Sequence, residues 1–420
     1  MHLLLLASLN PQFGHAKAGY IVFASLLEAL AKLGHRVSYA TTCCPNPPDA
    51  STLIRLAGAG VEFLGDFTDH VVSGEPVVSA LRSDIRTVRK AIISLERDDL
   101  PRFVAPEKTV AKLLESGADA ALLFWDSWFE HLLPDWRGIP IYGYLARPRY
   151  ASSLTRIEAV SAQDGGINEI IRRLVLKSLI KRQRDRHTKR MRMLTLGTNI
   201  CALDAAEYRN LGIACDYVPN TWPDLFGADW RKIRSEAEDA RASVAVLGNI
   251  GDLTGTGNLF GVKYLAEQVL PHLKQHKVGA WNINLCGRGE LPDDVARLLG
   301  TDGINVKGFV DDIDGEMLAN RIFLLLNNAG PYTGGYTRVA YAFSSGSCLV
   351  AHRRLADSMP EVEHGVNALL GNDAKEIADL LAEAIANPAL TTRLGVAARS
   401  TYEMKYQPRV VAERLLSMME

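Results

Sequence analysis

Short apolar runs alternate along the chain with longer segments in which apolar residues recur at helical spacing. This alternation predicts strands followed by amphipathic helices, the pattern of a parallel sheet with helices on both faces. In the first half of the chain the expected strands are 3–9, 36–40, 61–64, 120–124, 139–144 and 195–203. In the second half they are 244–247, 281–285, 304–306, 322–326, 348–351 and 368–370.

The segment between the first two expected strands reads as a helix. Residues 20–33 place four leucines on one face, from Leu26 to Leu33, and Gly34 follows as a C-cap. A polar and charged segment, 222–240, separates the two series of strands. The sequence therefore predicts two α/β units in tandem, with a cleft between them for a ligand.

Charge and composition narrow the function classes. The 420 residues include 47 Lys and Arg against 48 Asp and Glu, so the net charge of −1 gives no general attraction to nucleic acid or to an acidic membrane. The six cysteines show no CxxC spacing and no pairing with histidine, which predicts reduced thiols in a cytoplasmic protein without a metal site. No apolar stretch reaches the roughly 18 residues of a membrane span, and the apolar start of the chain is too short for a signal peptide.

Three glycine-containing segments lie between an expected strand and an expected helix. Glycines at such a junction let backbone N–H groups approach a phosphate, whose charge the helix dipole favours. An ordinary tight turn explains any one of them alone, but together they mark strand ends in both units. The segments are 10–15, 285–289 and 330–338.

The C-terminal half resembles family-4 glycosyltransferases over about residues 243–405. The matching segments agree with that family in order and spacing. They are LGN at 247–249, Asn258 with VLP at 269–271, CGRG at 286–289, VKGFVDD at 306–312, GYTR at 335–338, FSSGSCLV at 343–350, PEVEHGVNALL at 360–370 and LGVAAR at 394–399.

This resemblance implies the GT-B architecture, an α/β fold of two Rossmann-like parallel-sheet domains facing a cleft. Residues 1–222 would form the acceptor-binding domain, 223–405 the nucleotide-sugar-binding domain, and 406–420 a helix that crosses back to the first domain. The implied activity is a hexosyltransferase-type glycosyltransferase that uses a UDP-, GDP- or dTDP-sugar. In GT-B enzymes helix dipoles and basic side chains neutralise the leaving diphosphate, so no cofactor and no metal are required.

One motif departs from the family pattern. The family carries a Glu-x7-Glu pair that holds the donor sugar and the ribose, whereas Thr333 and Tyr341 occupy the two positions here. A carboxylate accepts both hydroxyls of a ribose diol, while Thr and Tyr offer one oxygen each. Arg338 remains at a position that faces the diphosphate in related enzymes, and its guanidinium suits phosphate. Glu363, in a segment near the donor in related enzymes, would replace a lost carboxylate.

The first half resembles the GT-B class more loosely. Gly14 and His15 before a helix look like the opening of family-1 glycosyltransferases as much as of family 4. In family 1 the histidine of this loop deprotonates the acceptor hydroxyl and an aspartate orients it, and the counterparts here are His15 and Asp126. Family 1 inverts the anomeric configuration and family 4 retains it; the longer C-terminal match favours retention.

The expected site residues follow from these motifs. His15 and Asp126 are expected in acceptor chemistry, although a turn histidine and a helix N-cap are the alternatives. The alternative for Arg338 is an ion pair with a neighbouring acid, and for Glu363 a solvated surface position. The residues expected to bind the donor are Gly14, Asn249, Gly287, Arg288, Thr333, Gly334, Gly335, Thr337, Arg338, Tyr341 and Glu363.

Segment 172–192, from Arg172 to Arg192, is strongly basic on one side and apolar on another. Such a helix either makes a peripheral contact with an anionic membrane or packs as a long solvated helix on the first domain. The acceptor is not identified and ranges over small molecules, glycans and lipid-linked molecules. Two rival functions stay open: a non-catalytic GT-B protein that binds a nucleotide, a glycan or a partner, and a sugar-nucleotide epimerase.

Overall fold

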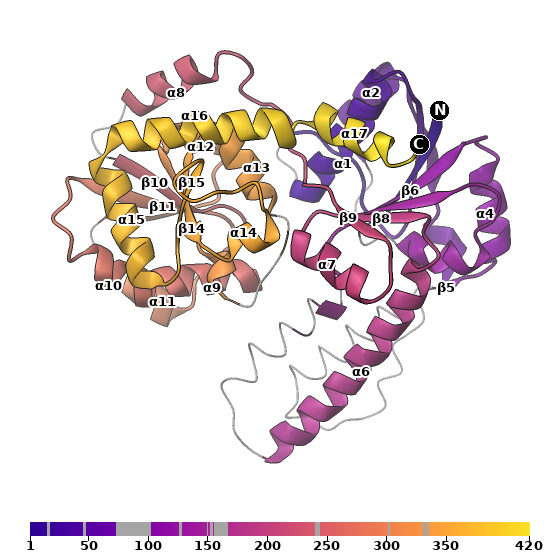
Figure 1. The fold of residues 1–420 in the computed structure, drawn as a ribbon, viewed down its shortest axis with the longest axis horizontal. Coiled ribbons are helices and arrows are strands. Elements are labelled where there is room, and N and C mark those ends of the chain that lie inside the picture. Colours follow the sequence, from indigo (N-terminus) through magenta and orange to yellow (C-terminus); the bar gives the residue numbers. More distant parts are fainter. Residues whose placement is uncertain are drawn as a thin grey trace. The chain divides into compact units, whose positions relative to one another are not determined.

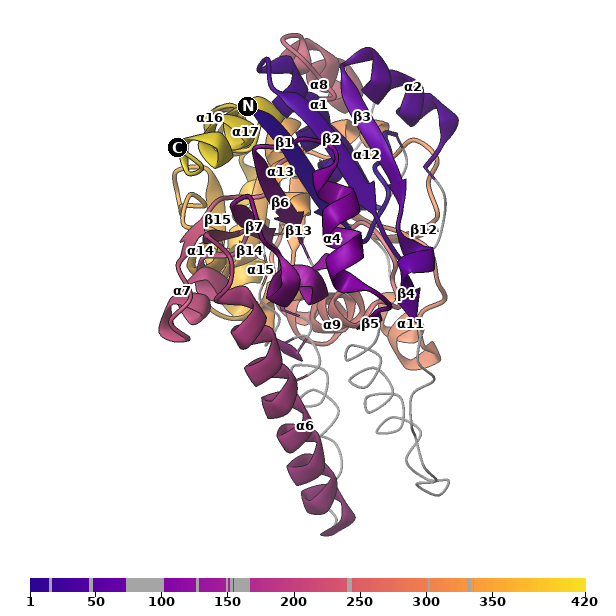
Figure 2. The same ribbon diagram turned by 90° about the vertical axis from the view of Figure 1, so that its right-hand side faces the viewer.

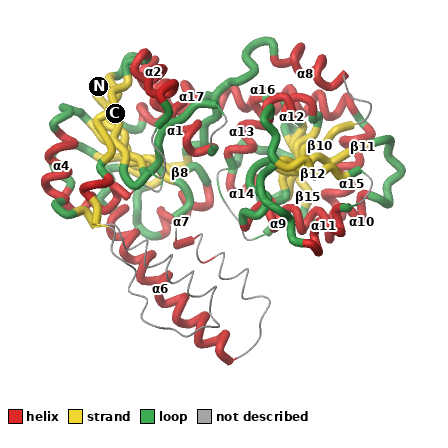
Figure 3. Tube along the Cα trace, turned by 180° about the vertical axis from the view of Figure 1, so that it is seen from behind, coloured by secondary structure: helices red, strands yellow, loops and turns green. Residues whose placement is uncertain are grey.

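The computed structural model describes residues 1–14, 17–44, 48–72, 102–125, 128–148, 150–151, 154, 167–239, 244–300, 303–330, 334 and 336–420. The chain divides into two compact units, Met1–Pro219 with Val411–Glu420, and Asn220–Val410. In each unit a parallel sheet lies among helices (Figure 1, Figure 3).

The first unit is built on a seven-stranded parallel sheet in the order β3-β2-β1-β6-β7-β8-β9 (Figure 2). The strands are β1 His2–Ala7, β2 Arg36–Thr41, β3 Val61–Asp66, β6 Ala120–Phe124, β7 Ile141–Leu145, β8 Leu196–Asn199 and β9 Cys215–Tyr217, and β4 Val71–Val72 pairs with β5 Arg102–Phe103 in a separate antiparallel ribbon. The helices are α1 Ala18–Lys32, α2 Ala50–Gly58, α4 Pro106–Leu114, α6 Ile167–Met191, α7 Ala202–Asn210 and α17 Pro408–Ser417, with 3-10 segments η1 Thr68–His70 and η2 Trp128–Asp135.

The strands predicted in the first half are confirmed except for the extent of the run 195–203, and the short strands β4, β5 and β9 were not predicted. Every residue of β1 is buried, because helices cover both faces of the sheet, and this explains its continuous apolar run. Gly34 adopts a φ of +87° after α1, as a helix C-cap requires. The run 195–203, however, is not one strand: β8 ends at Asn199 and α7 begins at Ala202. The edge strand β9 was not predicted, since its three residues include an exposed Asp216 and make no apolar run.

The second unit contains all six strands predicted for it, in the parallel order β12-β11-β10-β13-β14-β15. They are β10 Val244–Asn249, β11 Trp281–Cys286, β12 Ile304–Gly308, β13 Ile322–Leu325, β14 Cys348–His352 and β15 Ala368–Gly371. The helices are α8 Trp230–Asp239, α9 Thr256–Tyr264, α10 Leu270–Leu273, α11 Asp293–Leu299, α12 Ile313–Ala319, α13 Thr337–Ser344, α14 Leu355–Ser358, α15 Ala374–Ala386 and α16 Pro388–Lys405, with a π-helical turn η3 Leu265–Val269 and a 3-10 turn η4 Asn327–Ala329.

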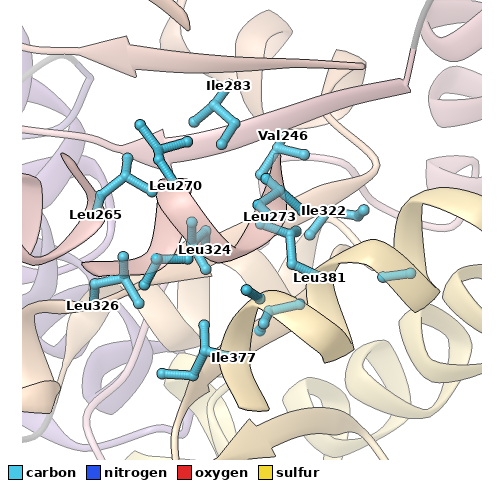
Figure 4. Packing of buried hydrophobic residues seen from close by; sticks show 14 of the residues in the cluster. Val246, Leu265, Leu270, Leu273, Ile283, Ile322, Leu324, Leu326, Ile377 and Leu381 are labelled. Atoms are coloured by element: carbon cyan, nitrogen blue, oxygen red, sulfur yellow. The ribbon is translucent and has the colours of Figure 1, made fainter. Parts of the chain in front are cut away.

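One face of this second sheet packs on α9, η3, α10 and α15 (Figure 4). Val246, Ile283, Ile322 and Leu324 point from the strands into this layer, and each is at most 1% exposed. Their partners from the helices include Leu265, Leu270, Leu273, Ile377 and Leu381. This buried layer holds the strands in register, so the loops at their carboxyl ends start from fixed positions.

A buried ion pair ties the segment before α8 to the body of the second unit. The side chain of Arg399, on α16, is only 4% exposed and donates two hydrogen bonds to Asp224, at 2.9 and 2.6 Å. Arg399 also donates to the carbonyl oxygen of Ser344. A buried arginine is tolerated where its donors are paired, so Asp224 fixes this polar segment against the second sheet's helices.

The end of the chain packs on the first unit. Arg414 on α17 donates to the carbonyl oxygen of Tyr217 at 2.7 Å, and the hydroxyl of Tyr142 donates to the carbonyl oxygen of Met419 at 3.2 Å. These contacts add α17 to the helices of the seven-stranded sheet.

The long helix α6 is anchored at its C-terminal end by a nearly buried charge cluster. Glu130, in η2, accepts from Arg190 at 2.6 Å and lies 3.2 Å from His187, and all three side chains are at most 17% exposed. His187 also pairs with the hydroxyl of Tyr208 at 2.7 Å. Burial alone would raise the pKa of Glu130, but the charges of His187 and Arg190 hold that pKa well below its usual range.

We expect Glu130→Gln to lower the free energy of unfolding by about 3–5 kcal/mol at neutral pH, because the Arg190 cation would remain buried without an anionic partner. A carboxyl whose pKa is lower in the folded state stabilises fully above the ordinary glutamate value of 4.5 and progressively less below it. The deficit of the variant should therefore shrink as the pH falls below that value.

Urea denaturation at several pH values measures this difference. Glu115→Gln, at an exposed glutamate after α4, is the matched control and should change stability by less than about 0.5 kcal/mol. Equal stability of the two variants at pH 7 would show that the cluster does not anchor α6.

Candidate functional site

The second sheet has a topological switch point between β10 and β13. The chain runs from β10 through β11 to β12 on one side and from β13 through β14 to β15 on the other. Ligands of such sheets bind outside the carboxyl ends of the strands at this point. Two helices, α9 and α13, begin there, and neither start has a side-chain cap, so their first N–H groups keep their hydrogen-bonding capacity for another partner.

Three polar side chains meet beside these helix starts. Arg338, in the first turn of α13, donates from Nη2 to the amide oxygen of Asn258 at 2.6 Å. Asn327, directly after β13, donates to the same oxygen at 2.6 Å. Asn258 and Asn327 are each 8% exposed. The cluster therefore joins α9, α13 and the end of β13 through one amide oxygen.

No described carboxylate balances the positive charge of Arg338. Its burial lowers the pKa of its guanidinium to about 10, and among the residues that the structure describes no carboxylate lies within ion-pair distance of it. This excludes, for those residues, the alternative of an arginine paired with a neighbouring acid. A partly desolvated guanidinium without an anion is stabilised when an anionic ligand approaches, and its planar donors match a phosphate.

Asn249 supplies a second unused donor at the same edge. It is the last residue of β10, is 4% exposed, and its Nδ2 is buried without a hydrogen-bond partner in the described part of the chain. Buried polar atoms are almost always paired, so an orphaned amide at the switch point indicates a group that the protein itself does not supply.

Gly287 has a different role from the one predicted. Its N–H donates to the carbonyl oxygen of Gly308 at 2.7 Å, so it is not available to a phosphate. A Cβ added at Gly287 would lie 1.5 Å from the carbonyl oxygen of Gly251. Gly287 therefore serves the close approach of the loops after β10 and β11, which a further bond from Leu253 N to the oxygen of Arg288, at 2.8 Å, also joins.

Tyr341 is also assigned differently by the structure. It is 3% exposed, packs against Trp222 and Phe226, and donates its hydroxyl to Asp314. The hydroxyl is therefore used within the core of the second unit, and Tyr341 cannot stand in for the missing glutamate without breaking that contact.

The other predicted donor residues are not part of the cluster of Arg338, Asn258 and Asn327. Arg288 is exposed, with its guanidinium 4.4 Å from the ring centroid of Phe309. Glu363 is exposed, and its backbone lies in a tight turn that Asn367 caps at 2.8 Å. Thr337 opens α13 next to Arg338, and Gly334 is half-buried with no atom within 4 Å of an added Cβ. Thr333 and Gly335 lie outside the described residues.

The first sheet has its own switch point, between β1 and β6. Gly14 follows β1 with a φ of +81°, and Trp125 follows β6 with a φ of +51°, a left-handed conformation that costs a non-glycine residue energy. The ring of Trp125 covers Gly19 of α1, where an added Cβ would lie 2.8 Å from it. His15 and Asp126, next to these two positions, lie outside the described residues.

The cluster at the second switch point contains two residues that the sequence did not predict as site residues, Asn258 and Asn327. Asn258 falls in the segment that resembles family 4, but nothing in its neighbourhood marks it as polar and buried. Asn327 and Asn328 follow directly on the apolar run 322–326. Such a polar pair at the end of a predicted strand is the signal that could have marked Asn327 as a site residue.

Metal and membrane features were sought in the described ranges. These contain no group of three or more His, Cys, Asp or Glu side chains that could hold a metal ion. Within the same ranges no helix combines the length and the apolar character needed to cross a bilayer.

A known family model matches most of the second unit. Residues 244–387 match the family model described as "Glycosyl transferases group 1". This range includes all six strands of the second sheet and the whole cluster around Arg338. No curated protein matches the chain.

Solved structures match over both units. HepE of Anabaena, in complex with UDP and glucose, is 13% identical, with 99% of this chain and 98% of that chain covered and a TM-score of 0.56. Sucrose-phosphate synthase from Thermosynechococcus elongatus is 14% identical, with 100% and 98% covered and a TM-score of 0.59. A mutant of S. aureus TarM, in complex with fondaparinux, alpha-GlcNAc-glycerol and UDP, is 10% identical, with 100% of both chains covered and a TM-score of 0.60. At such identities the likeness establishes the fold, and the predicted GT-B class is confirmed.

We expect Gly287→Ala to destabilise the second unit by about 3 kcal/mol or more, because the new Cβ would overlap backbone atoms that cannot turn away as a side chain can. Gly279→Ala is the matched control: Gly279 has no atom within 4 Å of an added Cβ and no positive φ. That substitution should change stability by less than about 1 kcal/mol.

Urea denaturation compares the two variants with the unaltered protein. If Gly287→Ala unfolds at the same urea concentration as Gly279→Ala, the close approach of the two loops is not a constraint on the fold.

Proposed function

We propose that this chain, whose second unit carries a group 1 glycosyltransferase domain, transfers a sugar from a nucleotide-sugar donor to an acceptor hydroxyl. The observation that carries the proposal is the uncompensated guanidinium of Arg338 at the switch point of the matched domain. The diphosphate of the donor is the anion that would complete it.

The chemistry explains why such a site would accelerate transfer. The bond between the anomeric carbon and the diphosphate oxygen breaks and a bond forms between that carbon and the acceptor oxygen. The proton of the acceptor hydroxyl passes to His15 or to an oxygen of the released diphosphate. Negative charge grows on the diphosphate as it leaves, so a fixed cation and the N-termini of α9 and α13 stabilise the transition state more than the ground state. Asn249 would add a hydrogen bond to the bound donor through Nδ2.

We infer UDP as the first nucleotide to test, because the HepE and TarM structures contain it. GDP- and dTDP-sugars remain the alternatives from the sequence. The group 1 domain favours retention of the anomeric configuration. Glu363, which is exposed, is the carboxylate we propose for the ribose in place of the missing glutamate pair.

Two rivals remain, and the departure from the Glu-x7-Glu pattern supports the first of them. A non-catalytic GT-B protein would bind a nucleotide or a glycan without turning it over, and a sugar-nucleotide epimerase would release a new nucleotide-sugar. A transferase usually hydrolyses its donor slowly when no acceptor is present. Donor turnover therefore separates the three.

We expect slow release of free sugar from UDP-glucose, GDP-mannose or dTDP-glucose, measured by chromatography of the products. Turnover should continue in EDTA, since we assign neutralisation of the diphosphate to Arg338 and the helix N-termini. Full loss in EDTA that Mg²⁺ or Mn²⁺ restores would contradict this assignment. A new nucleotide-sugar would establish the epimerase, and unchanged donor would favour the binding protein.

The same assay tests the proposed role of His15 as the group that contacts the acceptor hydroxyl, with Asp126 orienting it. His15→Ala should lower kcat by at least about tenfold and leave UDP affinity and Tm nearly unchanged. A normal kcat would remove both residues from the site, and a large fall in Tm would indicate a structural histidine.

We expect Arg338→Ala to weaken UDP binding by about 1.5–3 kcal/mol, the usual loss of a charge-assisted hydrogen bond. Isothermal titration calorimetry measures the affinity directly. Arg297→Ala, at an exposed arginine on α11 that donates to the carbonyl oxygen of Asp293, is the control and should bind UDP normally. Equal affinity of the Arg338 variant and the control would show that the diphosphate does not bind at the switch point.

A further inference from the structure

A nearly buried carboxylate lies at the carboxyl edge of the first sheet. Asp204, in the first turn of α7 just after β8, is 4% exposed, and its Oδ2 has no hydrogen-bond partner in the described part of the chain. A buried charged group of this kind is costly unless something completes it.

Side-chain capping of α7 does not account for the empty oxygen of Asp204. No side chain caps α7, whose N-cap residue is Cys201, and Asp204 interacts with the side chain of Cys201. The N–H of Cys201 is already bonded to the side-chain oxygen of Asn199 at 2.8 Å.

Asn199 also fixes what lies next to Asp204. It is fully buried and donates from Nδ2 to the carbonyl oxygen of Ala146 at 3.1 Å, which ties the loop after β7 to the start of α7. Arg147 follows Ala146 in that loop, and its charge attracts Asp204. Two neighbouring strand ends thus carry an anion and a cation whose charges attract each other, at the carboxyl edge of the sheet.

The charges around Asp204 define the ligand that suits it. Glu207, one turn later on α7, accepts from the hydroxyl of Tyr150 at 3.3 Å and lies 3.9 Å from Arg184. Arg147 already contributes a positive charge that attracts Asp204, so a neutral hydrogen-bond donor can complete the empty oxygen without a second cation. A hydroxyl group is such a donor.

We propose that Asp204 binds a hydroxyl of the acceptor, and that the acceptor is a carbohydrate or a similar polyhydroxylated molecule. This inference rests on the proposed glycosyl transfer and assigns its acceptor to the edge formed by β7 and β8. In this proposal Asp204 positions the acceptor and contributes to specificity. Its loss should weaken acceptor binding, and so raise the KM for the acceptor, more than it lowers kcat.

The pH dependence gives a readout that needs no variant. Burial raises the pKa of Asp204 to about 6, although Arg147 lowers it and Glu207 adds to the rise. The carboxylate that accepts the hydroxyl is therefore present above about pH 6 and is lost below it. The KM for the acceptor should rise as the pH falls through this value, while slow hydrolysis of the donor should show no such step.

The experiment uses the full chain with radiolabelled UDP-glucose, GDP-mannose and dTDP-glucose and a panel of p-nitrophenyl α- and β-glycosides as acceptors. For the glycoside that the unaltered protein glycosylates fastest, Asp204→Asn should raise KM about tenfold or more. Donor hydrolysis and Tm should change little. Asp216→Asn, at an exposed aspartate of β9, is the control and should behave as the unaltered protein.

The outcomes separate the two proposals. Normal acceptor KM in Asp204→Asn, or a pH-independent KM in the unaltered protein, overturns the role of Asp204 and leaves glycosyl transfer standing. Donor hydrolysis without transfer to any glycoside overturns the carbohydrate acceptor. If donor is neither hydrolysed nor transferred, the proposed function itself fails, and this inference fails with it.

Discussion

Arg338 donates from Nη2 to the amide oxygen of Asn258, and this hydrogen bond joins the two helices that begin at the switch point of the second sheet. An amide orients the guanidinium without neutralising it, whereas a carboxylate would have done both. The positive charge therefore remains available to an outside anion. The buried layer beneath, with Val246, Ile322 and Leu324, holds the strand ends that fix these groups in place.

Much of the fold was predictable because a strand that is buried on both faces consists of a continuous run of apolar residues. The central strands β1, β6, β7 and β13 are buried along their whole length and read as apolar runs. The more exposed strands β3 and β12 still contain short apolar runs, at 61–64 and 304–306, that marked them. The pattern fails where a strand is very short or where an apolar run continues past the end of a strand. β9 is an edge strand of three residues, and the run 195–203 continues from β8 through the buried Ile200 and Cys201 to the start of α7, where no local signal marks the change.

The candidate site was predictable only in part, for a related reason. Arg338 and Asn249 were expected at strand and helix ends, and the structure finds a buried, unpaired amide nitrogen on Asn249 and no described carboxylate paired with Arg338. Asn258 and Asn327 meet across 69 residues of sequence, a contact that no local spacing encodes. Gly287 and Tyr341 were predicted at ligand positions from their place in the motifs. In the structure Gly287 allows the close approach of Gly251, and the hydroxyl of Tyr341 bonds Asp314. Neither contact can be read from the local sequence.

Each unit contains a charged side chain that the described residues do not fully pair, and the two charges are opposite. In the second unit it is a cation, Arg338, held by amides; in the first it is an anion, Asp204, beside Arg147 with one oxygen empty. The proposed anionic donor and neutral, hydroxyl-bearing acceptor would require this division, because a carboxylate near the diphosphate would repel it and an uncompensated cation at the acceptor edge would favour anions over hydroxyls. On the proposed function, the incomplete group in each unit would thus select its substrate by charge: an arginine without a described carboxylate would admit the diphosphate, and an aspartate that an arginine attracts would admit a hydroxyl.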